Sequence, residues 1–144
     1  MLILLGLGVL AILLAIALQV DDWSRDLTTN RAATSIDSSD PVLRSLLLPA
    51  SVDQVKEVIH RFAEQNDAWT CDAIDTTSAT ATTLSLVRKT RWLGFADDVQ
   101  VFLQATDRGT RVEVASESRV GKADFGQNPR NIRELLRALR DALE

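Results

Sequence analysis

The sequence has few of the residues that common catalytic and metal sites require. Among its 144 residues, Cys71 is the single cysteine and His60 is the single histidine. One cysteine excludes an internal disulfide, and one histidine leaves serine-triad, cysteine–histidine and His/Cys zinc sites without their parts. The chain also has no glycine-rich phosphate loop of Walker or Rossmann spacing. We therefore expect no catalytic residues, no metal and no cofactor.

An excess of positive charge is also missing. The 16 lysines and arginines are outnumbered by 20 aspartates and glutamates, so the net charge is −4. A nucleic-acid-binding protein normally has a clear basic footprint, and no nucleic-acid partner is expected here. Without its apolar N-terminus the chain retains roughly 120 residues, which is enough for one domain with its own core.

The longest hydrophobic run lies at the N-terminus. Residues 2–18 include no charged or polar side chain. A helix over residues 1–20 would be roughly 30 Å long, which matches the hydrocarbon core of a bilayer. Trp23 follows at a place where an indole ring commonly anchors at the interface. We predict a single-pass transmembrane anchor. The alternative is a cleaved signal peptide with an A-x-A match at residues 15–17, but the segment lacks a basic n-region.

The predicted anchor indicates where the rest of the chain lies. A short N-terminus followed by an anchor usually leaves the next domain outside, so we expect a periplasmic domain. Gly8, Ala11 and Ala15 share one face of the predicted span, and small residues let another helix approach closely. The expected partners are therefore the lipid bilayer and other membrane protein subunits.

The domain itself is predicted at residues 51–144. In the preceding stretch at 21–50, apolar residues recur with no sustained helical or strand period, and this stretch is predicted to be an extended linker or arm. Ser51 and Gln54 form a capping box, since each side chain can accept a free backbone N–H of the other. This box opens an amphipathic helix that should end near Asn66.

A second helix is predicted at the C-terminus. Asn128 followed by Pro129 is a strong start signal, because asparagine caps the first turn and proline fits the first helical position. Its apolar residues form a single stripe. They are Ile132, Leu135, Leu136, Leu139 and Leu143.

Between the helices, alternating apolar and polar residues predict four strands. They are expected at residues 69–75, 82–92, 99–105 and 111–119. In the last strand, Val112 and Val114 face one side, whereas charged residues such as Glu113 face the other. Two helices on one face of a four-stranded antiparallel sheet form a two-layer domain. The predicted fold class is therefore an N-terminal transmembrane helix followed by an α+β domain whose other sheet face is open.

Three short motifs occur in the second half of the chain. They are Phe-x-Asp-Asp at residues 95–98, Ser-x-Ser-Arg-x-Gly at 116–121 and Asp-x-Gly-x-Asn at 124–128. Together with the segments at 27–30 and 40–44, they resemble the domain-of-unknown-function family 1499 of small, often membrane-anchored bacterial proteins. The resemblance covers about residues 23–140. It implies a shared fold, and it implies no function because the family has no settled activity.

The chain departs from this family pattern at two positions. Where the family often has arginine, this chain has Ala115 and Asn131, and Arg130 lies one position before the second of these. If the two arginines serve an anion site in the family, that site is weakened in this chain.

The corner between the last strand and the last helix gathers the best cluster of polar residues. The cluster consists of Asp97, Arg119, Lys122, Asp124 and Asn128. One interpretation is structural, in which Arg119 pairs with an aspartate and ties the corner together. The other is a small-ligand or anion site at the N-terminus of the last helix, where free N–H groups face outward. Since adjacent strand residues point to opposite faces, Asp97 and Asp98 are not expected to form a catalytic dyad.

Two further groups of residues are candidates for interactions. A stripe on the last helix consists of Arg130, Arg133, Arg137 and Arg140. This stripe either meets lipid headgroups or an acidic protein surface, or it is a solvated face with acidic partners four residues away. Trp92 and Phe95 lie in an apolar loop, and Phe102 lies on the charged sheet face. The loop either closes the core at one end of the sheet or forms an exposed contact, and Phe102 is a candidate for an exposed contact.

These patterns favour a protein that works by binding. We predict a membrane-anchored accessory or assembly subunit of a larger membrane protein complex, for example a photosynthetic or respiratory one. The alternative is a small-ligand or lipid-binding module that uses the corner around Arg119. A third interpretation is an enzyme of unrecognised chemistry.

Overall fold

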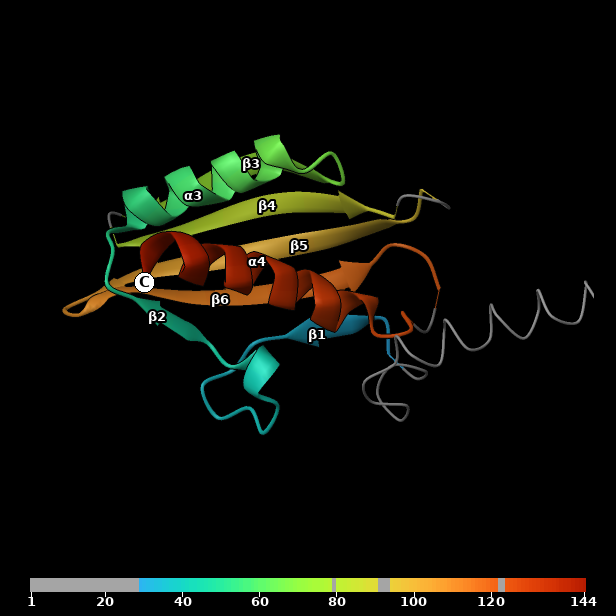
Figure 1. The fold of residues 1–144 in the computed structure, drawn as a ribbon, viewed down its shortest axis with the longest axis horizontal. Helices are drawn as coiled ribbons and strands as arrows, with labels where there is room; N and C mark the ends of the chain where they lie inside the picture. The colour runs from blue at the N-terminus through green and yellow to red at the C-terminus, as the bar shows by residue number, and fades with distance from the viewer. Residues whose placement is uncertain (1–28, 79, 91–93, 122–123) are drawn as a thin grey trace, which may run out of the picture.

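Six strands in the described part of the chain form one antiparallel sheet, and two helices cover one of its faces (Figure 1). The computed structural model describes residues 29–144 except 79, 91–93 and 122–123. The strands are β1 (Arg31–Ala33), β2 (Leu46–Leu48), β3 (Trp69–Ser78), β4 (Ala81–Lys89), β5 (Ala96–Thr106) and β6 (Gly109–Ser118). Their order in the sheet is β1-β6-β5-β4-β3, and β2 also pairs with β6.

The long strands β4, β5 and β6 follow the alternation of their side chains. In β5, Val99, Val101 and Leu103 are buried, whereas the intervening Gln100 and Phe102 are exposed. Strands β4 and β6 show the same alternation over most of their length. Because successive side chains of a strand point to opposite faces, this pattern puts one apolar face under the helices, and no other element of the described residues covers the opposite face.

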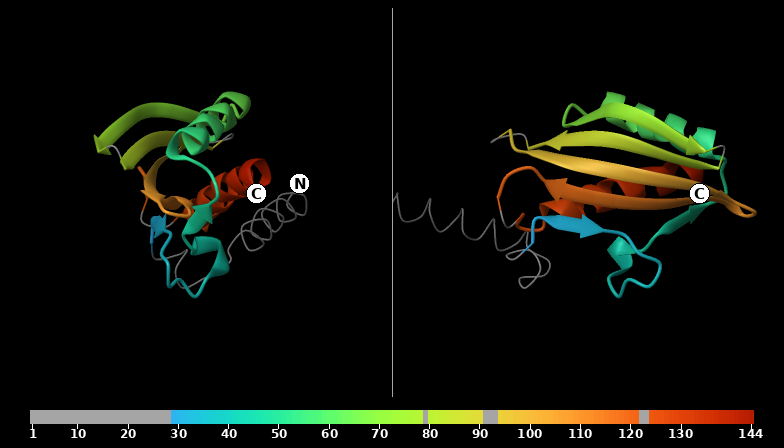
Figure 2. Two further views of the ribbon diagram at one scale, coloured as in Figure 1. Left: turned by 90° about the vertical axis from the view of Figure 1, so that its left-hand side faces the viewer. Right: turned by 180° about the vertical axis from the view of Figure 1, so that it is seen from behind.

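The two helices lie side by side on the same face of the sheet (Figure 2, left). Helix α3 (Val52–Gln65) begins at the predicted capping box, in which the Gln54 N–H donates to Ser51 Oγ at 3.2 Å. The Ser51 N–H in turn donates to the Gln54 side chain at 2.8 Å. Helix α4 (Gln127–Leu143) buries the predicted apolar stripe against the sheet, except for Leu143, which is only partly buried. The core between the layers includes Val55, Ile59, Leu84, Val101, Ile132, Leu135 and Leu139, all wholly buried.

The β5–β6 turn requires a glycine. Gly109 has a φ of +125°, which side chains other than glycine rarely adopt. A Cβ at this position would collide with the carbonyl oxygen of Leu48, on the neighbouring strand β2. The close approach allows Leu48 to pair with Thr110 and brings β2 onto the edge of β6.

The structure corrects the predicted strand count. The sheet of the described residues has six strands rather than four, because part of the predicted linker at 21–50 forms β1, the 3-10 helix η1 (Pro41–Leu43) and β2. In the pairing with β6, Ala32 lies opposite Ser116 and Leu46 lies opposite Val112. Each of these strands has only three residues, which are too few to show an alternation of apolar and polar side chains in the sequence.

The predicted fold class is also corrected in its transmembrane helix, which no helix of the described residues supports. The described architecture consists of the sheet, η1 and two helices, and no helix in this part of the chain is long and apolar enough to cross a membrane. The prediction was placed on residues 1–20, which lie outside the described residues. The same holds for the candidate interaction residues Gly8, Ala11, Ala15 and Trp23.

Candidate functional site

A buried cluster of polar side chains lies where β5 begins, β6 ends and α4 begins. We call it the polar corner, and it consists of Asp97, Ser116, Ser118, Asn128 and Asn131. Asp97 is 2% exposed, and Ser116, Asn128 and Asn131 are wholly buried. On β6 the two serines continue the inward alternation of the valines before them, so they face α4.

Hydrogen bonds connect the five side chains of the polar corner into a closed ring. The carboxylate of Asp97 accepts from Ser118 Oγ at 2.7 Å and from Asn131 Nδ2 at 2.9 Å. The same Asn131 amide donates to Ser116 Oγ at 3.1 Å, and Ser116 donates to Asn128 Oδ1 at 2.6 Å. Asn128 Nδ2 then donates to Ser118 Oγ at 3.1 Å, which closes the ring.

The ring is extended to the chain before β1 and to the first turn of α4. Asn128 Nδ2 makes its second hydrogen bond to the carbonyl oxygen of Asn30 at 2.6 Å. Asn131 Oδ1 accepts from Gln127 Nε2 at 2.7 Å. Each carboxamide therefore uses both amide hydrogens and its oxygen. A buried polar network satisfied in this way is expected to be rigid and to specify one arrangement of the elements it joins.

The N-terminus of α4 is capped by Asp124 rather than by Asn128, the residue that the Asn-Pro signal suggested. Gly126, the residue before the helix, has a φ of +75° and provides no side-chain cap. Asp124 Oδ1 accepts from the Gly126 N–H, and its Oδ2 accepts from the Asn128 N–H, both at 2.9 Å. The side chain of Asn128 is thereby free to enter the polar corner. The position at which a helix N-terminus would hold an anion is occupied by this carboxylate.

Arg119 lies at the surface of the same corner. Its Nε and Nη2 donate to Asp98 Oδ1 at 3.0 Å and 2.7 Å, and both side chains are half exposed. The hydrogen bonds and the negative charge of Asp98 raise the pKa of Arg119 above its ordinary value. The predicted pairing of Arg119 with an aspartate is thus confirmed. Asp97 and Asp98 point to opposite faces, since one is buried under α4 and the other is exposed.

The polar corner offers little for catalysis. Both serine hydroxyls already donate hydrogen bonds, and no group of three His, Cys, Asp or Glu residues in the described part of the chain could hold a metal ion. The thiol of Cys71 lies on β3, and its pKa is raised by burial and then by the charge of Asp72, so it is a poor nucleophile at neutral pH. Arg88, which pairs in register with Asp97, has a buried Nε without a hydrogen-bond partner among the described residues, and nothing in the structure explains it.

The uncovered sheet face presents a shallow hollow around Phe102. The ring is 41% exposed and has Thr83 and Glu113 as its cross-strand neighbours. The hollow measures about 250 Å³ and is lined by β4, β5 and β6. Phe102 is therefore an exposed contact candidate rather than a core residue.

The arginine stripe of α4 borders a groove between the two helices. The groove measures about 580 Å³, and its lining includes Phe62 of α3 and Arg130, Arg133 and Arg137 of α4. Arg137 has its predicted partner, Asp141, at 3.8 Å, and both side chains are largely exposed. Exposed pairs of this kind add little to stability. Arg133 and Arg140 are also exposed, whereas Arg130 is half-buried and donates to Gln127 Oε1 at 3.2 Å.

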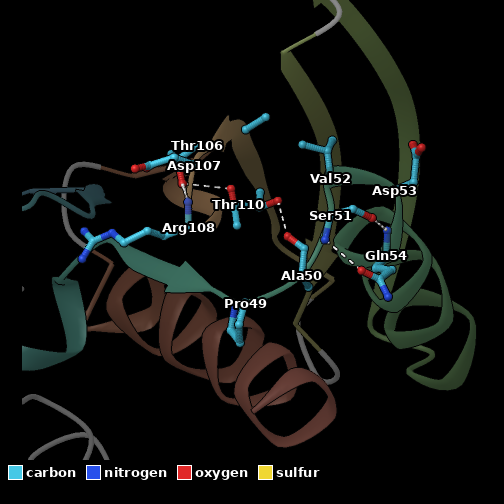
Figure 3. A pocket seen from close by; sticks show the side chains of 12 residues that line it. Pro49, Ala50, Ser51, Val52, Asp53, Gln54, Thr106, Asp107, Arg108 and Thr110 are labelled. Atoms are coloured by element: carbon cyan, nitrogen blue, oxygen red, sulfur yellow. Dashed lines mark hydrogen bonds between the residues drawn. The ribbon is translucent and has the colours of Figure 1, made fainter.

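A further groove, of about 630 Å³, lies at the opposite end of the sheet from the polar corner (Figure 3). The β5–β6 turn lines one side, and residues 49–54 line the other. Thr110 Oγ1 donates to the carbonyl oxygen of Ala50 across it at 2.7 Å. At the start of α3, the capping box engages the N–H groups of Ser51 and Gln54.

The structure therefore brings only part of the predicted site together. Asn128 is hydrogen-bonded to Asp124 directly and to Asp97 through Ser118, whereas Arg119 is on the surface with Asp98. Two further predicted residues, Trp92 and Lys122, also lie outside the described residues. The sequence interpretation missed Ser116, Ser118 and Asn131. The alternation of β6 contains the signal for the serines, because it places polar residues on the covered face directly after Val112 and Val114.

The family model described as "Protein of unknown function (DUF1499)" matches residues 22–139, which agrees with the resemblance seen in the motifs. No curated protein matches the chain. Among solved structures, a point mutant of the protein Mog1 is 13% identical over 83% of this chain and 81% of that chain, with a TM-score of 0.39. A likeness of this size carries no argument about function.

Proposed function

The chain belongs to the family described as protein of unknown function (DUF1499), and we propose that it works by binding, as a non-catalytic accessory or assembly subunit of a larger membrane protein complex. The proposed partners are other subunits of such a complex, for example a photosynthetic or respiratory one, on the periplasmic side of a membrane. The absence of enzymatic activity is part of this proposal.

One observation carries the proposal, namely an exposed aromatic ring on the uncovered sheet face. Phe102 is flanked along β5 by Gln100 and Gln104, and across the sheet by Thr83 and Glu113. Its 41% exposure is high for a phenylalanine in the middle of a long strand. An apolar anchor with a polar rim is the usual arrangement of a protein–protein contact.

The polar corner gives less support to the alternative of a small-ligand site. The carboxylate of Asp124 already accepts the N–H groups at the start of α4, and Asp98 already binds the guanidinium of Arg119. A ligand anion would have to displace both carboxylates. The same contacts give a direct structural reason for the charged residues of this corner.

The test is to replace Phe102 with glutamine, the residue found at positions 100 and 104 on the same face. Because the ring is exposed, we expect the melting temperature to change little. In gently solubilised native membranes, we expect the variant to leave the high-mass complex in which the unmodified protein migrates. The matched control is Ile36→Gln, which removes a 60% exposed apolar side chain elsewhere and should leave the complex intact.

Two results would contradict the proposal at different levels. Migration of the unmodified protein as a lone monomer in mild detergent would exclude the accessory role. Retention of the Phe102→Gln variant in the complex, at the level of the control, would exclude the uncovered sheet face as the contact.

A further inference from the structure

Three exposed apolar side chains lie at the end of the sheet where the chain enters the domain. Phe95 is 50% exposed, Val120 is 64% exposed and Phe125 is 46% exposed. We call these three residues the apolar tip. Large apolar side chains that gather at one end of a domain usually mark a contact surface.

The backbone shows that the three residues share this end. The N–H of Arg119, next to Val120, donates to the carbonyl oxygen of Ala96, next to Phe95, at 3.0 Å. The N–H of Asp124, next to Phe125, donates to the carbonyl oxygen of Thr29 at 3.2 Å. The β4–β5 connection, the β6–α4 connection and the first described residue therefore meet at one end of the sheet (Figures 1 and 2).

The two phenylalanines are held in place by their backbones. Phe125 has a φ of +51°, a conformation that few residues other than glycine adopt, and it lies between the capping carboxylate of Asp124 and Gly126. The Phe95 N–H donates to Thr90 Oγ1 at 2.9 Å, and its carbonyl oxygen accepts from the Thr90 N–H at 2.8 Å. Both rings are thus presented at the surface by fixed turns.

The sequence before Thr29 indicates what the apolar tip meets. Residues 2–18 include no charged or polar side chain, and such a run requires an apolar environment of its own. Ten residues, 19–28, separate it from Thr29, and they reach at most about 36 Å when fully extended. A patch of three side chains is too small to bury a run of this length. The apolar medium that accepts the run therefore lies within about 36 Å of Thr29, which is at the same end of the sheet as the tip.

We infer that the apolar tip contacts the surface of a lipid bilayer, with Phe95, Val120 and Phe125 in the interfacial layer. Aromatic rings favour this layer, because it accepts an apolar ring beside polar headgroups. The contact is made by apolar side chains rather than by a basic group, because the guanidinium of the neighbouring Arg119 is already bound by Asp98. The inference does not depend on the uncovered sheet face and is tested separately from it.

The test uses the full chain with Cys71→Ser, reconstituted in vesicles of phosphatidylcholine alone. An environment-sensitive dye is attached to a cysteine that replaces Phe95, Val120 or Phe125, one at a time. The control carries the dye at Ile36→Cys, which lies away from the tip. Two residues before it, the Thr34 N–H donates to the carbonyl oxygen of Val114, in the middle of β6. Iodide then probes access from water, and a spin-labelled lipid probes access from the bilayer. Unchanged melting temperatures confirm that each labelled variant retains the fold.

We expect the spin-labelled lipid to quench the three tip dyes several-fold more strongly than the Ile36 dye, and iodide to quench them several-fold less. Equal quenching by iodide at the tip and at Ile36 would overturn the inference. Tip dyes shielded from both quenchers would also overturn it, because another part of this chain or a second protein would then cover the tip.

Discussion

Among single residues, Asn128 shows best how this protein accommodates buried polar groups. Its side chain is wholly buried and makes three hydrogen bonds, to Ser116, Ser118 and the backbone of Asn30. These partners come from β6 and from the chain before β1, which are far apart in sequence. A buried carboxamide of this kind is favourable only while every partner is in place.

The substitution Asn128→Ala should therefore destabilise the fold by about 2–3 kcal/mol, because it leaves the buried Ser116 hydroxyl and other groups of the ring without a partner. The measurement is the free energy of unfolding from urea denaturation. The control is Gln100→Ala, which removes an exposed carboxamide from β5 and should cost less than about 0.5 kcal/mol. Equal losses in the free energy of unfolding for the two substitutions would show that the buried hydrogen bonds of Asn128 stabilise the fold no more than an exposed carboxamide does.

Among the elements, the β5–β6 hairpin depends on its glycine for a reason that reaches beyond the turn. Gly109 ends the turn with a positive φ, and its missing Cβ also makes room for the backbone of Leu48. The pairing of β2 with β6 starts at this point, with Leu48 opposite Thr110. The turn residue thus decides whether a separate strand can join the sheet.

We predict that Gly109→Ala destabilises the protein by at least about 2 kcal/mol, because backbone strain and the collision with Leu48 add to one another. Gly94→Ala is the matched control, since Gly94 has a φ of +65° but no atom near its would-be Cβ. It should cost only about 1 kcal/mol of strain. Thermal unfolding of both variants measures the difference, and similar losses at the two positions would refute the role of close approach.

For the molecule as a whole, the segment before α3 is part of the domain. Leu43, Leu46 and Leu48 belong to the core, and β1 and β2 pair with β6 along most of its length. Without them β6 would become an exposed edge with unpaired backbone groups. The domain boundary therefore lies before β1 rather than at residue 51.

A protein of residues 29–144 should unfold cooperatively, whereas one of residues 51–144 should not reach a folded state. Loss of three buried leucines, at about 2–5 kcal/mol each, matches the whole stability of an ordinary domain. Circular dichroism and amide proton dispersion in NMR spectra distinguish the two cases. A sharp thermal transition of the shorter protein would show that β1 and β2 are dispensable.

Several elements could be predicted because their signals lie within a short stretch of sequence. The capping box at Ser51 and Gln54 set the start of α3, and the leucine stripe identified α4, because neighbouring turns of a helix lie within the same short stretch of sequence. Alternation likewise identified β4, β5 and β6.

Other features depend on contacts between residues that are distant in sequence. β1 and β2 are too short to carry a period, and they become strands because the distant strand β6 provides their partners, such as Glu117 for Arg31 and Val112 for Leu46. Asp124 rather than Asn128 caps α4, because the side chain of Asn128 is buried in the polar corner and accepts a hydrogen bond from Ser116 there. Short strands and buried polar contacts draw their stability from residues distant in sequence, and local patterns do not contain that information.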